Sequence, residues 1–243
     1  MIDKARLLVI LNVYLSILVV LFVSCEKQEN KGIKDIDGNY YDTVRIGTQV
    51  WMTENLKTTK YTDGTPIPFV SSKDTWNLLG NIGKAYCWYN NDVGNKDIYG
   101  ALYTWPAATN GASNSNTILS NVQGVCPTGW HLPSEAEWTE LETYLGGDKI
   151  AGAKLKEAGN IHWNDNSAGV NNETGFTGLP GGNCNDQGSY QNLHIIGYYW
   201  SSSESNVDPD NAGMIMSFLN QTNNSYITLK IKLWGASVRC IMD

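Results

Sequence analysis

One stretch, Cys126–Trp138, packs a turn, a strand end and a helix start into a few residues; its sequence is CPTGWHLPSEAEW. A Pro-Thr-Gly turn leads into a short extended run, which Pro133 stops before a helix can begin at Ser134. Ser134 and Glu137 have the spacing of a capping box, in which each side chain hydrogen-bonds the other residue's main-chain N–H. This helix start constrains how the rest of the chain can fold.

Apolar residues after this start recur at helical spacing. Trp138, Leu141 and Leu145 fall on one face of a helix expected over 134–145. Trp130 stands where the chain must turn back on itself. We therefore predict that Trp130 and Trp138 are core residues rather than ligand contacts.

The stretch also resembles the core motif of the Fibrobacter succinogenes major paralogous domain, a family of bacterial secreted and surface lipoproteins. Other matching motifs follow in family order: 49–56, 86–89, 99–105, 155–156, 174–182, 199–204 and 237–240. The matches cover nearly everything after residue 38. The family is itself similar to C-type-lectin-like domains, so the resemblance implies that fold. It implies no common activity.

Asn and Gly are plentiful in the chain, which favours turns and short strands. A hairpin is expected around Gly47-Thr48, a short helix within 101–108, and a second longer helix over 149–158 with Gly159 as its C-cap. Further strands are predicted at 176–179, 198–202, 212–219, 226–232 and 236–241. Two short helices within a meander of short, mostly antiparallel strands make an α+β fold. This agrees with the C-type-lectin-like fold that the resemblance implies.

Residues 1–24 have the pattern of a bacterial lipoprotein signal peptide. Lys4 and Arg6 precede an apolar run, and a small residue stands directly before Cys25, the predicted lipidation site. The alternative is an uncleaved N-terminal anchor. Either way the rest of the chain is exported and held at a membrane, and the outer membrane or cell surface is the expected location.

Residues 25–35 are expected to form a polar tether and residues 36–243 a single domain, since no low-complexity linker interrupts them. Cleavage before Cys25 removes two basic residues and one acidic residue, which changes the formal net charge from −7 to −8. An acidic surface disfavours nucleic acid and anionic lipid as partners. Contact with a membrane is therefore expected through the N-terminal lipid anchor.

Four cysteines remain after Cys25: Cys87, Cys126, Cys184 and Cys240. An even number in an exported chain suggests two disulfides, for which three pairings are possible. In the lectin-like fold that the resemblance implies, a bridge ties the first-helix region to the last strand, a role that fits Cys126 with Cys240. Cys87 and Cys184 then form the second pair. A metal site is less favoured, because the chain has no CxxC pair and only 3 histidines.

Trp163-Asn164-Asp165 resembles the triplet that supplies calcium ligands in calcium-dependent C-type lectins. Asn164 and Asp165 begin a run rich in side-chain oxygens, which suits calcium. The triplet stands earlier in this chain than in those lectins, so a plain Asn/Asp turn remains the alternative. No other cofactor is expected. For stacking on a ligand, the candidate residues are Tyr190, Tyr198 and Trp234, because aromatic side chains combine an apolar body with a polar tip.

Other polar residues are expected to be structural. We expect His131 to be buried and hydrogen-bonded to the main chain, and Arg239 to pair with a buried carboxylate, Glu137. The serine cluster at 201–203 has no Gly-x-Ser-x-Gly elbow and no assignable base, so a serine hydrolase is not expected.

The sequence thus favours a non-enzymatic, lipid-anchored, exported binding module that recognises glycan or protein at the cell surface. Two alternatives stay open. One is a structural component of the envelope or of a surface assembly, with no small ligand. The other is an enzyme related to formylglycine-generating enzymes, which share a related lectin-like fold and use cysteines with copper.

Overall fold

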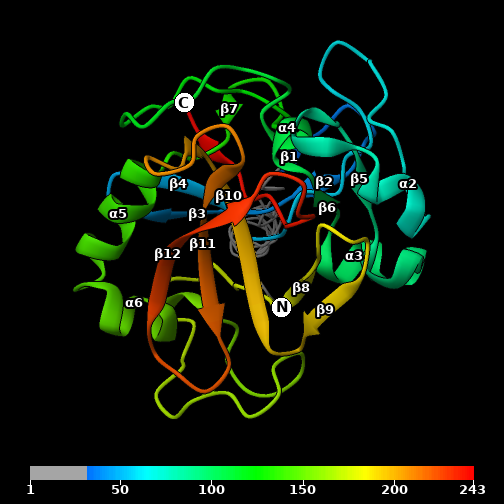
Figure 1. Cartoon of the computed structure of the whole chain (residues 1–243). Helices are drawn as coiled ribbons and strands as arrows, with labels where there is room; N and C mark the ends of the chain where they lie inside the picture. Colours follow the sequence, from blue (N-terminus) through cyan, green and yellow to red (C-terminus); the bar gives the residue numbers. More distant parts are fainter. Residues whose placement is uncertain (1–31) are drawn as a thin grey trace, which may run out of the picture. The chain divides into compact units, whose positions relative to one another are not determined.

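Short antiparallel strands and a few short helices make up residues 32–243, the part of the chain that the computed structural model describes (Figure 1). The α+β class predicted from the sequence is confirmed. The strands are β1 (Ile33–Lys34), β2 (Tyr40–Tyr41), β3 (Thr43–Ile46), β4 (Gln49–Met52), β5 (Tyr86–Cys87), β6 (Leu102–Tyr103), β7 (Trp130–His131), β8 (Gly181–Cys184), β9 (Tyr190–Leu193), β10 (Ile196–Glu204), β11 (Ala212–Leu219), β12 (Ser225–Ile231) and β13 (Ile241–Met242). The helices are α2 (Lys73–Asn77), α3 (Lys96–Tyr99), α4 (Trp105–Ala108), α5 (Glu135–Tyr144) and α6 (Asp148–Leu155), with 3-10 turns η1 (Gly80–Ile82), η2 (Tyr89–Asn91) and η3 (Val93–Asn95).

A four-stranded sheet, in the order β3-β4-β13-β7, gathers the first hairpin, the end of the chain and the Cys126–Trp138 stretch. Ile241 pairs with Trp51 on one side and with His131 on the other. The predicted hairpin is confirmed, and its turn depends on Gly47, whose φ of 61° favours a residue without a Cβ. The C-terminal strand is therefore held between two segments that are far from it in sequence.

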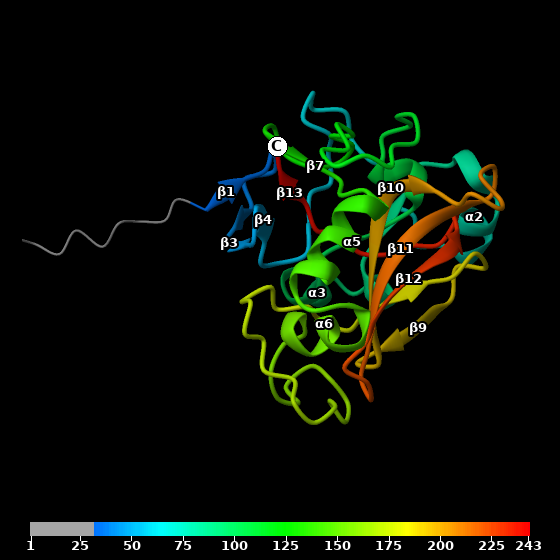
Figure 2. The same cartoon turned by 90° about the vertical axis from the view of Figure 1, so that its left-hand side faces the viewer.

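A second sheet, in the order β10-β11-β12, packs against α5 (Figure 2). The side chains between them form a buried aromatic cluster that includes Trp51, Trp138, Phe176 and Tyr199. The ring centroids of Trp51 and Trp138 lie 4.5 Å apart. Trp130 belongs to a second core on the other side of this sheet, together with Trp200 and residues of β6 and α4. The prediction that Trp130 and Trp138 are core residues is confirmed, since they are 4% and 0% exposed.

Helix α5 begins as predicted. The Ser134 hydroxyl accepts the N–H of Glu137, and the Glu137 carboxylate accepts the N–H of Ser134. Helix α6 is shorter than predicted and Gly159 is not its C-cap, because the main chain after Leu155 pairs with Gly178 instead of continuing the helix.

Lys156 explains this departure from the helix. Its ammonium group donates to the carbonyls of Leu219, Asn220 and Thr222, which fixes the chain beside the end of β11. Burial of the side chain lowers the pKa of Lys156 to about 8.

Several strand boundaries differ from the predictions. Residues 176–179 form no strand, because Thr177 has a φ of 55° and the chain turns there. The strand of this region is instead β8, which begins at Gly181 and pairs with β9. The last predicted strand, 236–241, shortens to β13, since Ala236 and Ser237 each make only an isolated bridge. Strand β11 has the predicted bounds.

The folded domain starts earlier than predicted. Strand β1 pairs with β2, and Asp35 is buried, with its carboxylate accepting the Tyr41 hydroxyl at 2.6 Å. Residues 33–35 therefore belong to the domain and not to the tether, because they are hydrogen-bonded into it. The predicted signal peptide 1–24, the lipidation site Cys25 and the rest of the tether lie outside the described residues. Within residues 32–243, no helix has both the length and the apolar character to cross a membrane.

Candidate functional site

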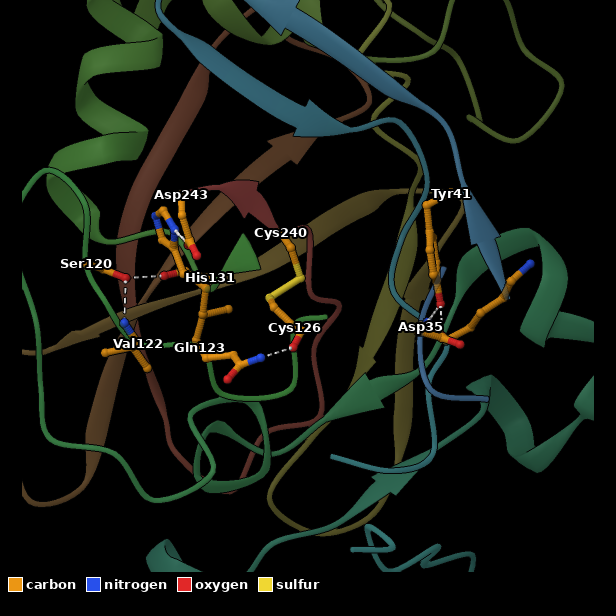
Figure 3. Close-up of a disulfide and its surroundings, with 11 residues drawn as sticks. Asp35, Tyr41, Ser120, Val122, Gln123, Cys126, His131, Cys240 and Asp243 are labelled. Atoms are coloured by element: carbon orange, nitrogen blue, oxygen red, sulfur yellow. Dashed lines mark hydrogen bonds and ion pairs between the residues drawn. A yellow bond between two sulfur atoms is a disulfide. The ribbon is translucent and has the colours of Figure 1, made fainter. Parts of the chain in front are cut away.

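The disulfide predicted between Cys126 and Cys240 is present, with Cα atoms 5.9 Å apart (Figure 3). It links the turn before β7 to the residue before β13. Both cysteines are fully buried within the core that contains Trp130. The bridge therefore locks the C-terminal strand onto the motif stretch.

The second predicted disulfide is not formed. Cys87 and Cys184 are free thiols, and both are buried. They belong to one apolar cluster, where burial and then hydrogen bonding with Cys184 raise the pKa of the Cys87 thiol. The prediction that Cys87 and Cys184 are disulfide-bonded is wrong, although the two residues do lie in the same cluster.

His131 lies between two carboxylates rather than against the main chain, which corrects the expected hydrogen bonding. Its Nε2 is 2.8 Å from Glu137 Oε1. Its Nδ1 is 2.7 Å from Asp243 Oδ1, and Figure 3 shows these two residues side by side. Burial alone would lower the pKa of His131, but the hydrogen bonds and charges of Glu137 and Asp243 outweigh it and raise the pKa. Since carboxylates only accept, the charged imidazolium satisfies both contacts.

Glu137 joins the helix start to this histidine. Besides His131, its carboxylate accepts the main-chain N–H groups of Ser134 and Leu119, at 2.8 and 2.9 Å. The nearby Ser120 hydroxyl donates to the carbonyl of Leu132. These contacts hold the motif stretch together.

Among residues 32–243, no carboxylate pairs with Arg239, so its predicted pairing with Glu137 is wrong. Its guanidinium donates to Asn55 Oδ1 and to the carbonyls of Met52, Phe176 and Thr177. It also lies over the Phe176 ring, 4.4 Å from the centroid. Burial lowers the pKa of Arg239 to about 10. Arg239 is structural, as predicted, but carbonyl oxygens accept the hydrogen bonds of its guanidinium. The Glu137 carboxylate is already occupied by His131 and by main-chain N–H groups.

A groove of about 710 Å³ opens between the β3–β4 turn and α5. On the helix it is lined by one stripe at helical spacing: Ala136, Thr139, Glu140, Thr143 and Tyr144. The other wall is formed by Ile46, Gly47, Thr48 and Gln49, and Ile118 also lines the groove. The stripe is adjacent to the buried face of α5, so one helix serves both the core and the groove.

Two side chains in the groove are held in place by the hairpin. The Tyr144 ring packs against Gly47, where an added Cβ would lie only 2.9 Å from a ring carbon. Tyr144 is nevertheless 65% exposed. The Thr48 hydroxyl donates to Glu140 Oε1 at 2.8 Å, and the amide of Gln49 lies 3.5 Å from Glu140 Oε2. An exposed aromatic ring and an oriented carboxylate therefore stand one helical turn apart.

The family model of the Fibrobacter succinogenes major domain (Fib_succ_major) matches residues 44–242. The chain belongs to this family. The match begins within β3 and ends within β13, so it spans both walls of the groove, the disulfide and Arg239. No curated protein and no solved structure matches the chain significantly.

The structure does not bring the three aromatic residues predicted to contact a ligand into the groove of this Fib_succ_major domain. Tyr198 is buried and meets the half-buried Trp234 ring edge to face, with Lys230 4.7 Å from the Trp234 centroid. Tyr190 lies elsewhere, against Tyr89. Tyr198 and Trp234 thus form one contact and Tyr190 another, and none of the three lines the groove.

Asn164 and Asp165, the calcium candidates, lie in an exposed turn. Asp165 has a φ of 48°, a left-handed conformation that Asp tolerates well in turns. Among residues 32–243, no group of three or more His, Cys, Asp or Glu side chains is arranged to hold a metal ion. The geometry fits the turn alternative, and calcium binding at this turn stays a prediction.

The groove residues were not predicted from the sequence, although two features of the sequence indicate them. Ile118 is an apolar residue in a loop otherwise rich in Asn and Ser, and it is 64% exposed. Tyr144 falls beside the apolar face of α5 rather than on it. An exposed apolar pair, Ile118-Leu119, in a polar loop and an aromatic residue at the margin of a helix face are the two features that could have indicated this surface.

Proposed function

We propose that this Fib_succ_major domain is an exported, lipid-anchored binding module, and that it holds its ligand, a glycan or a protein segment, in the groove between the β3–β4 turn and α5. The observation that carries the proposal is the groove itself. It combines apolar walls with a small number of oriented polar groups, the usual composition of a ligand site.

The surroundings of the groove support a binding role. Its walls are rigid, because α5 is capped at Ser134 and packed through Trp138, while the β3–β4 hairpin is paired to β13. The residues that face the groove are consequently held by core contacts on their other side. A preformed site of this kind avoids the entropic cost of ordering on binding.

The fold assignment within the proposal is C-type-lectin-like. It is supported by the sheet that joins the first hairpin to β13, and by the Cys126–Cys240 bridge between the first-helix region and the end of the chain. The bridge is the feature that the motif resemblance led us to expect. This assignment concerns the architecture alone. The binding proposal depends on the groove and does not depend on the fold assignment.

We expect Tyr144→Ala to weaken ligand binding at least about tenfold, because truncating a central aromatic contact typically costs more than 1 kcal/mol. The full chain, in a detergent without a sugar headgroup, would be screened against a glycan array and a displayed peptide library. Tyr40→Ala is the matched control, since Tyr40 is 61% exposed and lies on β2, outside the groove.

Binding that Tyr144→Ala removes and Tyr40→Ala retains would support the groove. Ligands that both variants bind as well as the unmodified chain would place the site elsewhere and end the proposal. The absence of any ligand in both screens would instead favour a structural component of the cell envelope.

Anchoring is tested separately at Cys25. We expect Cys25→Ala to remove fatty-acid labelling and either release the chain from membranes or block removal of the signal segment. Metabolic labelling followed by membrane fractionation measures both. A Cys25→Ala chain that still carries the label would show that lipid is attached at another residue, and an unlabelled but membrane-bound wild type would favour the uncleaved anchor.

A further inference from the structure

The residues that line the groove between the β3–β4 turn and α5 limit the classes of ligand that can bind there. Six of its ten lining residues carry hydroxyl, amide or carboxylate groups: Thr48, Gln49, Thr139, Glu140, Thr143 and Tyr144. Among residues 32–243, no Lys or Arg side chain lines it. Arg45, on β3, donates to the carbonyl of Thr48 and is not among the lining residues. A wall with one carboxylate and no cation disfavours phosphate, sulfate and carboxylate ligands.

Tyr144 offers the groove a fixed apolar plane. Its ring packs on Gly47, where a larger residue would collide with it, while most of the side chain stays exposed. An aromatic face of this kind suits a ligand with a flat apolar side, such as the C–H face of a sugar ring. Because the ring is already supported, little side-chain entropy is lost when a ligand stacks on it.

Glu140 offers acceptors beside that plane. The residue lies four positions before Tyr144, so the two side chains are neighbours on one face of α5. Thr48 donates to one carboxylate oxygen and orients the group, yet each carboxylate oxygen can accept more than one hydrogen bond. Two adjacent hydroxyls of a sugar could therefore donate to the two carboxylate oxygens together. The hydroxyls of Thr139 and Thr143 could hydrogen-bond the neighbouring hydroxyls of the same sugar.

We infer that the ligand of this groove is a neutral carbohydrate, stacked on Tyr144 and hydrogen-bonded to Glu140; this inference rests on the proposed function. Recognition does not use calcium, because one carboxylate in the wall falls far short of the six to eight oxygens that calcium requires. The turn at Asn164 and Asp165 plays no part in it.

The test titrates the full chain, in a detergent without a sugar headgroup, with methyl glycosides of neutral hexoses and N-acetylhexosamines and with their disaccharides. Glucuronic acid and a sulfated sugar serve as charged comparisons, and each titration is repeated in EDTA. We expect millimolar or tighter binding of at least one neutral sugar, unchanged by EDTA. Acidic sugars should bind at least about tenfold more weakly than their neutral counterparts.

Variants separate the two contacts. Tyr144→Phe keeps the ring and should bind within about twofold of wild type, whereas Tyr144→Ala should lose at least about tenfold. Glu140→Gln should weaken binding about tenfold, since the amide keeps only one acceptor oxygen. Glu135→Gln is the matched control: it is a glutamate of the same helix that does not line the groove, and its binding should not change.

Groove-dependent binding of peptides alone, a preference for acidic sugars, or loss of sugar binding in EDTA would each overturn the carbohydrate inference and leave the proposed binding function standing. Sugar binding that Tyr144→Ala and Glu140→Gln leave intact would overturn both.

Discussion

Trp138→Ala is expected to unfold the domain at a much lower temperature than the wild type. The side chain is fully buried and packs against Trp51, Phe176 and Tyr199. Replacing a buried tryptophan by alanine typically costs about 3–5 kcal/mol, because it removes apolar contacts and leaves a cavity. In a domain of this size the loss corresponds to a fall in Tm on the order of 10 °C, measured by calorimetry or circular dichroism.

Two control variants make this prediction specific. Among residues 32–243, the Trp138 Nε1 has no hydrogen-bond partner, so Trp138→Phe removes an unsatisfied buried donor and keeps most of the ring contacts. It should cost much less than alanine. Tyr144→Ala, six residues along the chain and exposed, should keep the wild-type Tm. A Trp138→Ala protein that melts within a degree or two of wild type would contradict the core assignment.

The local features of the fold could be predicted because their causes are local. The capping box of Ser134 and Glu137 and the hairpin around Gly47 depend on residues a few positions apart, and both are formed. The bounds of α6 could not be predicted, because its end is set by carbonyls of residues 219–222 that Lys156 reaches across the fold. Local propensity alone would have continued that helix.

The groove and the partners of the buried charges depend on contacts between distant segments. The sequence allows Glu137 to pair with Arg239, but in the structure the Glu137 carboxylate contacts His131. Arg239 donates instead to Asn55 and to main-chain carbonyls. The groove exists only because the β3–β4 turn packs beside α5, about ninety residues later in the chain, as in the contact of Thr48 with Glu140. The residues around each position do not show which distant segment it will contact.

Removal of the disulfide by Cys126→Ala with Cys240→Ala should lower the free energy of unfolding by roughly 5 kcal/mol, if the chain-entropy model holds for a bridge of this length. The two cysteines are 114 residues apart, so the bridge strongly restricts the unfolded chain. Ile241, next to Cys240, pairs with both β4 and β7. Without the bridge, the C-terminal strand can fray from this sheet. Urea unfolding followed by tryptophan fluorescence measures the loss.

Both cysteines are replaced together, because a single replacement would leave an unpaired thiol that air could oxidise to a new disulfide with Cys87 or Cys184. The matched control is the variant Cys87→Ala with Cys184→Ala, which keeps the bridge and removes the two thiols. Reduced wild type should unfold at nearly the same urea concentration as the Cys126→Ala, Cys240→Ala protein, whereas oxidised wild type should need considerably more. If oxidised and reduced wild type unfold at the same midpoint, the bridge does not stabilise the fold, and the four-stranded sheet must hold the C-terminal strand without it.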